Sequence, residues 1–71
     1  INKPEKIKFS DREKEMLKLI CTELTYKEIA DKMFLSPKTI DGYRDALFHK
    51  IGVKTRVGLA IYAIKNNYYK I

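Results

Sequence analysis

Two helix-start signals lie eleven residues apart in the middle of this 71-residue chain, and they restrict what it can fold into. Thr25 is followed three residues later by Glu28, the spacing of a reciprocal capping box. Ser36 is a favourable helix N-cap, and Pro37 occupies the next position, where a missing amide hydrogen costs nothing. A short helix must therefore end just before a longer one begins. Two helices joined by so tight a turn cross at a steep angle, which leaves the second projecting from the domain.

The rest of the sequence predicts two more helices and no strand. Ser10 and Glu13 form another capping box before a run of apolar residues at helical spacing, which we expect to end near Glu23. Gly52 is a left-handed stop for the helix that starts at Pro37, and Thr55 caps a fourth helix. The pattern predicts an all-α fold: a four-helix bundle that contains a helix-turn-helix. The inward-facing residues are predicted to be Met16, Leu17, Ile20, Cys21, Leu24, Ile29, Ala30, Met33, Ile40, Tyr43, Leu47, Phe48, Ile51, Leu59, Tyr62, Ala63 and Asn66, with Phe34 and Leu35 in the turn.

Length and composition are those of one small domain. Residues 1–8 mix charge with Pro4 and show little periodicity, so they are interpreted as a linker or interdomain arm ahead of a domain at 9–71. Cys21 is the only cysteine, and we expect it to pack as a small apolar side chain in a reducing cytosol, with no metal and no cofactor. No apolar run approaches the roughly 20 residues of a membrane span. These features predict a cytoplasmic protein without a membrane partner, and the start at Ile1 suggests a piece of a longer chain.

The positive charge is concentrated in the second half of the chain. The net charge is +6; residues 1–35 carry eight Lys and Arg against seven Asp and Glu, whereas residues 36–71 carry seven against two. The excess therefore begins with the helix that opens at Pro37. A polyanion is the natural partner of such a surface, although a solvated basic face would carry the same charge.

Residues 9–67 resemble the LuxR-type helix-turn-helix domain, also called the NarL/FixJ or GerE type. The matching segments are SDREKEML at 10–17, TYKEIA at 25–30, LSPKTI at 35–40, KIGVKTR at 50–56, and residues 59–63. The resemblance implies sequence-specific binding of double-stranded DNA by the output domain of a bacterial transcription regulator. It further implies a two-component response regulator whose receiver or sensor domain lies upstream of Ile1.

The amino ends of the second and third helices are suited to phosphate, because they offer free amides and a positive dipole end. Thr25 and Ser36 have a competing role as helix caps, and Arg56 has the alternative of pairing with Glu13. By the resemblance, the residues that contact the DNA backbone are Thr25, Lys27, Ser36, Lys38 and Thr39, with Lys50, Lys54 and Arg56 extending the basic track.

Base reading is expected from the groove-facing side of residues 37–48. The resemblance places Asp41, Gly42 and Asp45 there, with Arg44 close by. A carboxylate can accept from the amino group of cytosine, whereas Arg44 could bind a guanine or a phosphate. Our hypothesis is that Arg44 with Lys38 supplies attraction, either aspartate discriminates among bases, and Gly42 allows close approach. The alternative is that the two acids only weaken non-specific binding.

Several positions depart from the family pattern. Glu23 stands where a glycine usually ends the first helix, so we expect a positive φ there at a cost of about 1 kcal/mol. Asp41 replaces a frequent lysine, Tyr43 a frequent histidine and Ala46 a common asparagine. These changes concern the DNA site and leave the fold assignment as it is.

The fourth helix has a second apolar stripe made of Val57, Ile61 and Ile64. A helix that is apolar on two sides is either deeply buried or meets a partner. The resemblance implies a dimer contact, which would make the protein a homodimer on DNA. Tyr68 and Tyr69 could instead cover the stripe within the monomer.

Catalysis is not expected. His49 is the only histidine, and the sequence has no glycine-rich phosphate loop, paired-carboxylate signature or metal-ligand spacing. The stronger alternative to DNA binding is a protein-binding adaptor with the same fold, because Asp41 and Asp45 lie on the helix that would be presented.

Overall fold

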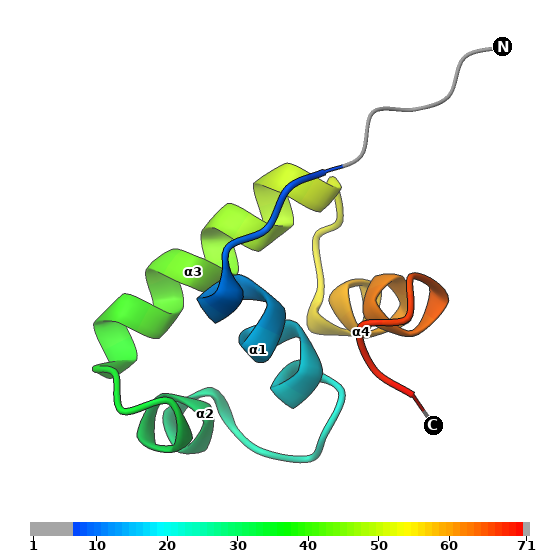
Figure 1. Cartoon of the computed structure of the whole chain (residues 1–71). Coiled ribbons are helices and arrows are strands. Elements are labelled where there is room, and N and C mark those ends of the chain that lie inside the picture. Colours follow the sequence, from blue (N-terminus) through cyan, green and yellow to red (C-terminus); the bar gives the residue numbers. More distant parts are fainter. Residues whose placement is uncertain (1–6, 71) are drawn as a thin grey trace, which may run out of the picture.

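The computed structural model describes residues 7–70, and within them the chain forms four helices and no strand. The helices are α1 (Asp11–Ile20), α2 (Tyr26–Lys32), α3 (Pro37–Ile51) and α4 (Arg56–Lys65). In Figure 1, α1 lies in the middle with α3 and α4 on either side, and α2 lies below, near the start of α3. The predicted all-α fold is confirmed. The expected arm at residues 1–8 lies outside the described residues except for Ile7 and Lys8.

All four helices begin at the predicted N-caps, which are Ser10, Thr25, Ser36 and Thr55. Each cap has extended backbone angles, and its hydroxyl accepts a hydrogen bond of 3.1–3.2 Å from the backbone amide three residues later. These bonds satisfy amides that have no partner inside the helix. At α1 and α2 the bond is reciprocated by a glutamate at that third position, so both predicted capping boxes are confirmed.

Helix ends were predicted less well than helix starts. Gly52 ends α3 in the left-handed conformation, at φ 82°, as expected. The end of α1 is at Ile20 rather than near Glu23, and Glu23 does not adopt a positive φ. The side chain of Thr22 explains the difference, because its hydroxyl donates to the Leu19 carbonyl and accepts from the Leu24 amide. A side chain satisfies the end of the helix there, so no left-handed residue is needed.

The turn between α2 and α3 occupies residues 33–36 and places an aromatic residue in the left-handed conformation. Phe34 has φ 58° and a side chain that is 93% exposed. The amide of Leu35 donates to the Ala30 carbonyl at 2.9 Å, and the amide of Phe34 donates to the Asp31 carbonyl at 3.1 Å. This is the hydrogen-bond pattern of a Schellman motif, in which Phe34 takes the position that glycine usually fills.

The core lies where the four helices meet, with α2 packed most closely on α3 and α1 on α4. Asn66, predicted to face inward, is exposed and donates its side-chain amide to the Tyr62 carbonyl. Phe9 and Glu13 are buried although the helical pattern did not place them inside. The buried apolar residues are Phe9, Met16, Leu17, Ile20, Ile29, Ala30, Met33, Ile40, Leu47, Leu59 and Ala63.

Two smaller features complete the packing around α4, one against α1 and one against the connection from α3. Cys21 is half-buried, and its thiol lies 3.4 Å from the Leu17 carbonyl and 3.7 Å from the Ala60 carbonyl. Burial raises the pKa of the Cys21 thiol, against a smaller opposing effect of nearby Arg56, so the group behaves as a small apolar side chain. In the first turn of α4, a Cβ added to Gly58 would lie 2.9 Å from the Cβ of Val53.

Candidate nucleic-acid interface

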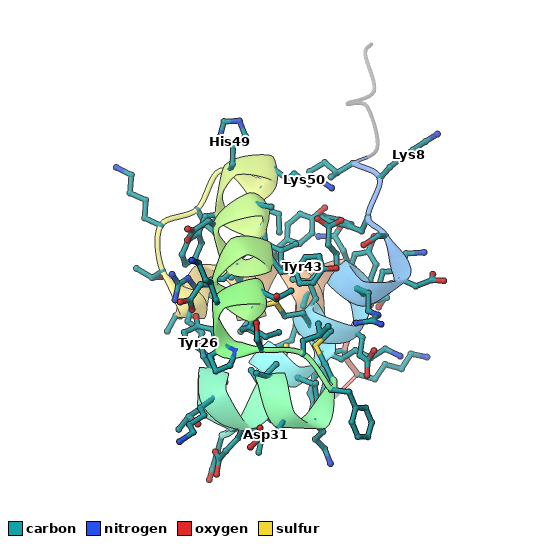
Figure 2. All side chains as sticks on the ribbon, turned by 90° about the vertical axis from the view of Figure 1, so that its left-hand side faces the viewer. Lys8, Tyr26, Asp31, Tyr43, His49 and Lys50 are labelled. Atoms are coloured by element: carbon teal, nitrogen blue, oxygen red, sulfur yellow. The ribbon has the colours of Figure 1, made fainter. Side chains whose placement is uncertain are left out.

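One side of α3 faces solvent along the length of the helix. Ile40 and Leu47 are fully buried, whereas the opposite side of the helix is exposed. Figure 2 shows α3 running vertically along the front of the molecule, with α2 below it. We call this exposed stripe the presented face; it consists of Lys38, Asp41, Gly42, Asp45 and His49.

The residues predicted to contact phosphate at the starts of α2 and α3 are all exposed. The hydroxyls of Thr25 and Ser36 serve as helix caps, which was their competing role, and Ser36 also donates to the Thr39 hydroxyl at 2.9 Å. Lys27 and Lys38 form no ion pair within the described part of the chain. The two lysine side chains are therefore available to a ligand, whereas the amides of Glu28 and Thr39 are already taken by the hydroxyl caps.

Lys50 is tied to α1 rather than free at the end of α3. Its Nζ lies 2.8 Å from Oε1 and 3.0 Å from Oε2 of Glu13, and it also donates to the Lys8 carbonyl at 3.3 Å. Figure 2 shows Lys50 extending from the upper end of α3. Burial alone would raise the pKa of Glu13, but hydrogen bonds from Lys50 and the Ser10 amide hold that pKa below its ordinary value.

Arg56 binds the carboxyl end of α1. Its guanidinium donates to the Ile20 carbonyl at 3.2 Å and to the Thr22 carbonyl at 3.0 Å. A cation at this position is favourable, because the last carbonyls of a helix carry partial negative charge. The predicted alternative of an Arg56–Glu13 ion pair is wrong, since Lys50 takes that place. Lys54, the remaining residue of the predicted basic track, is exposed.

Arg44 is held between two aspartates and an aromatic ring. Its Nη1 lies 3.3 Å from Oδ1 of Asp41, and its Nε and Nη2 lie 3.3 and 3.2 Å from Oδ1 of Asp45. The guanidinium carbon is 5.2 Å from the centre of the Tyr26 ring. The sequence placed Arg44 near the bases but did not reveal these partners.

Tyr26 is the residue of this surface that sequence reasoning missed. Figure 2 shows it beside α3, just above α2. The guanidinium of Arg56 lies 5.1 Å from the centre of the same ring, so two arginines contact one tyrosine at distances typical of cation–π interactions. Arg44 and Arg56 lie 18 and 30 residues further along the chain. No local motif marks Tyr26, because the contacts depend on how α2, α3 and α4 pack.

The apolar stripe of α4 is exposed in the monomer. Val57, Ile61 and Ile64 are 67%, 50% and 37% exposed. Tyr68 does not cover them; its ring packs edge-on against Phe9 at 5.6 Å between centroids. The predicted alternative, in which the C-terminal tyrosines cover the stripe, is therefore wrong.

Metal-binding clusters and membrane-spanning helices are both absent from the described region. Residues 7–70 hold no group of three or more His, Cys, Asp and Glu side chains that could bind a metal ion. No helix among them is both long and apolar enough to pass through a membrane.

A short helix, a four-residue turn and a second helix exposed along one side define a helix-turn-helix protein. This four-helix arrangement is the fold that the family resemblance implies. The chain belongs to the luxR family of bacterial regulatory proteins, whose GerE family model matches residues 8–63.

Two relatives indicate the kind of protein in which this domain occurs. The chain is 41% identical over 54 residues to the DNA-binding transcriptional activator DevR/DosR of Mycobacterium tuberculosis, covering 76% of this chain and 25% of that protein. It is 42% identical over 56 residues to the oxygen regulatory protein NreC of Staphylococcus aureus, covering 79% of this chain and 26% of that protein. The chain thus spans about a quarter of the length of these curated relatives.

Proposed function

We propose that this chain is the DNA-binding output domain of a bacterial transcription regulator of the two-component response-regulator type. The observation that carries the proposal is the presented face of α3, which is open to solvent while the other side of the helix anchors the core. A helix in this arrangement can enter the major groove. Membership of the luxR family and similarity to DevR/DosR, a DNA-binding transcriptional activator, support the same function.

The DNA backbone is bound by lysines and helix amino ends on the presented face and next to it. Lys27, Lys38 and Lys54 are exposed and supply charge, while the backbone amides of Lys27 and Lys38, which the cap hydroxyls do not engage, supply hydrogen-bond donors. Thr39 adds a hydroxyl at the start of α3. Lys50 and Arg56 are engaged within the monomer, so on this proposal they shape the surface around those contacts.

Base edges are read by the presented face, and α4 brings two domains together. Val57, Ile61 and Ile64 form the contact in a homodimer, which places two copies of α3 on adjacent half-sites. The small share of the relatives that this chain covers supports an upstream receiver or sensor domain in the full-length regulator. A protein with this function acts in the bacterial cytoplasm, on the chromosome. No catalytic step and no cofactor is needed for it.

Titration of a random double-stranded DNA pool at two salt concentrations tests the function. Affinity should fall steeply as salt rises, because each neutralised phosphate releases a counterion and contributes about −0.9 to the slope of log K against log salt. Lys38→Ala should weaken binding to every sequence alike and lower this slope by about 1. Lys65→Ala is a suitable control, because Lys65 is an exposed lysine in the last turn of α4.

A protein-binding adaptor is the second candidate, and one observation favours it. Asp41 and Asp45 place carboxylates on the presented face, where phosphates would be repelled. The same titration separates the two functions. Binding that does not weaken with salt, or no binding at all, would favour the adaptor.

A further inference from the structure

We propose that Arg44 is a positioning residue that holds Asp41 and Asp45 as acceptors for cytosine amino groups in the major groove. The proposal rests on the DNA-binding function proposed above and says which base that surface recognises. It assigns Arg44 a supporting role behind the two aspartates instead of a contact of its own.

The exposure of the three side chains supports an arrangement in which Arg44 lies behind the two aspartates. The Arg44 side chain is 27% exposed, whereas those of Asp41 and Asp45 are 55% and 69% exposed. The arginine therefore lies deeper, between the Tyr26 ring and the carboxylates, and the acids lie outermost on the presented face. A partner that approaches α3 meets the carboxylates first.

The hydrogen bonds leave each carboxylate with acceptor capacity. Both hydrogen bonds from Arg44 to Asp45 end on Oδ1, and the ion pair with Asp41 is also formed with Oδ1. Among residues 7–70, no hydrogen bond is made to Oδ2 of either acid. An ionised carboxylate has no proton to donate, so these oxygens can only accept.

Arg44 also makes the two acids compatible with DNA. Alone, they would bring two negative charges next to the phosphates; with the guanidinium between them, the group carries a net charge of −1. An isolated surface ion pair fixes side-chain positions only weakly. Here one guanidinium bridges two carboxylates and rests on an aromatic ring, and that combination restrains all three side chains.

The chemistry of the major groove then selects the base. Guanine presents only acceptors, and thymine an acceptor and a methyl group, so neither satisfies a carboxylate. Adenine has an amino group, but its N7 acceptor lies beside that group and repels the second oxygen. Cytosine offers an amino donor without a neighbouring acceptor on the same base. Gly42 lies between the acids with nothing within 4 Å of its missing Cβ, so a base pair can approach the backbone there.

Asp45→Asn and Asp41→Asn are the first test, carried out by selecting bound duplexes from a random pool with the 71-residue chain. An asparagine both donates and accepts, which matches the paired N6 and N7 groups of adenine. We expect the preferred base to change from cytosine to adenine at one position of each half-site, with about tenfold discrimination. Lys38→Ala, on the same face, is the matched control: its affinity should fall while its preferred sequence stays unchanged.

The positioning role is tested by changing the support behind the acids. Arg44→Met keeps both aspartates but removes the bridge, and Tyr26→Leu removes the ring. In both variants we expect the preference for cytosine to fall about fivefold or more, whereas Tyr26→Phe, which keeps the ring, should retain it. Thermal unfolding followed by circular dichroism shows whether each variant remains folded, and Asp45→Asn tests base choice on a surface side chain that the core does not need.

The outcomes distinguish the two proposals. If the unchanged chain selects no sequence and its affinity for DNA does not change with salt concentration, the proposed function fails and this inference fails with it. If the chain selects a sequence but both asparagine variants select the same one, DNA binding stands and the cytosine assignment is overturned. If Arg44→Met keeps the full preference for cytosine, the positioning role is overturned.

Discussion

The two capping boxes of this domain have the same local geometry and different surroundings. In each, a glutamate Oε1 accepts from the amide of the cap residue, at 2.9 Å for Glu13 and 2.8 Å for Glu28. Glu13, however, is only 6% exposed and is ion-paired with Lys50. Glu28 is exposed and has no ion-pair partner in the part of the chain that the structure describes.

The difference shows how one short motif can serve two purposes. At the start of α1 the box joins three segments, because Lys50 comes from α3 and also binds the Lys8 carbonyl. At the start of α2 the box only begins a helix, which leaves Thr25 and Lys27 facing solvent. The first box therefore stabilises the fold, while the second leaves a surface open for a ligand.

The largest expected effect comes from removing the carboxylate of the α1 box. Glu13→Ala should lower the free energy of unfolding by about 3 kcal/mol, since it removes a buried carboxylate that is paired with the exposed Lys50 and accepts from the Ser10 amide. Glu13→Gln keeps an acceptor and loses the charge, so about half of that loss is expected. Urea unfolding measures both. A loss for Glu28→Ala as large as that for Glu13→Ala would remove the distinction between the two boxes.

Removing the other partner should have a smaller effect. Lys50→Met keeps the aliphatic part of the side chain and leaves Glu13 with the Ser10 amide, at an expected cost of about 1–2 kcal/mol. A double-mutant cycle with Glu13→Gln measures the coupling between the two side chains. Strictly additive losses would show that the pair is not coupled.

Acid should weaken the domain through Glu13. The pKa of this carboxyl is lower in the folded chain than its ordinary value of 4.5, so the folded state favours the ionised form. That contribution to stability is fully present above pH 4.5. It is lost as the pH falls through the pKa that Glu13 has in the folded chain. The urea midpoint of unfolding can be measured as the buffer is lowered from about pH 6 to about pH 3. It should fall less for Glu13→Gln than for the unchanged chain.

The smallest effects on stability are expected at the α2 box. Thr25→Ala should cost about 1 kcal/mol and Glu28→Ala about 0.5 kcal/mol, because an exposed cap contributes only its local hydrogen bonds. If α2 faces DNA as proposed, Thr25→Ala should also weaken binding about threefold, and Thr25→Ser should restore it. Gel-shift titration of the folded variants tests this. Equal DNA affinity for the unchanged chain, Thr25→Ala and Thr25→Ser would place Thr25 outside the interface.

The sequence predicted those features that depend on neighbours three or four residues away. The starts of all four helices follow from a cap residue and the amide three positions on, so Ser10, Thr25, Ser36 and Thr55 could be found without coordinates. The stop at Gly52 is equally local.

Features that depend on the crossing of helices were not predictable in this way. Whether Lys50 or Arg56 reaches Glu13 depends on how α3 lies against α1, and the periodicity of neither helix shows that. In the candidate site, the inward-facing positions of α3 followed from its helical pattern, whereas the expected base-reading positions came from the family resemblance. The contact of Arg44 and Arg56 with Tyr26 did not, because it requires three helices in place.

The fit of Gly58 against Val53 has a consequence for how this domain can evolve. Because even one extra carbon at position 58 would collide with the residue that connects α3 to α4, every amino acid larger than glycine forces that connection to move. This contact therefore helps to fix the angle between the helix proposed to read DNA and the helix proposed to pair two copies. A larger residue at position 58 would therefore need a compensating change at Val53, whereas the exposed positions of both helices are free of this packing constraint.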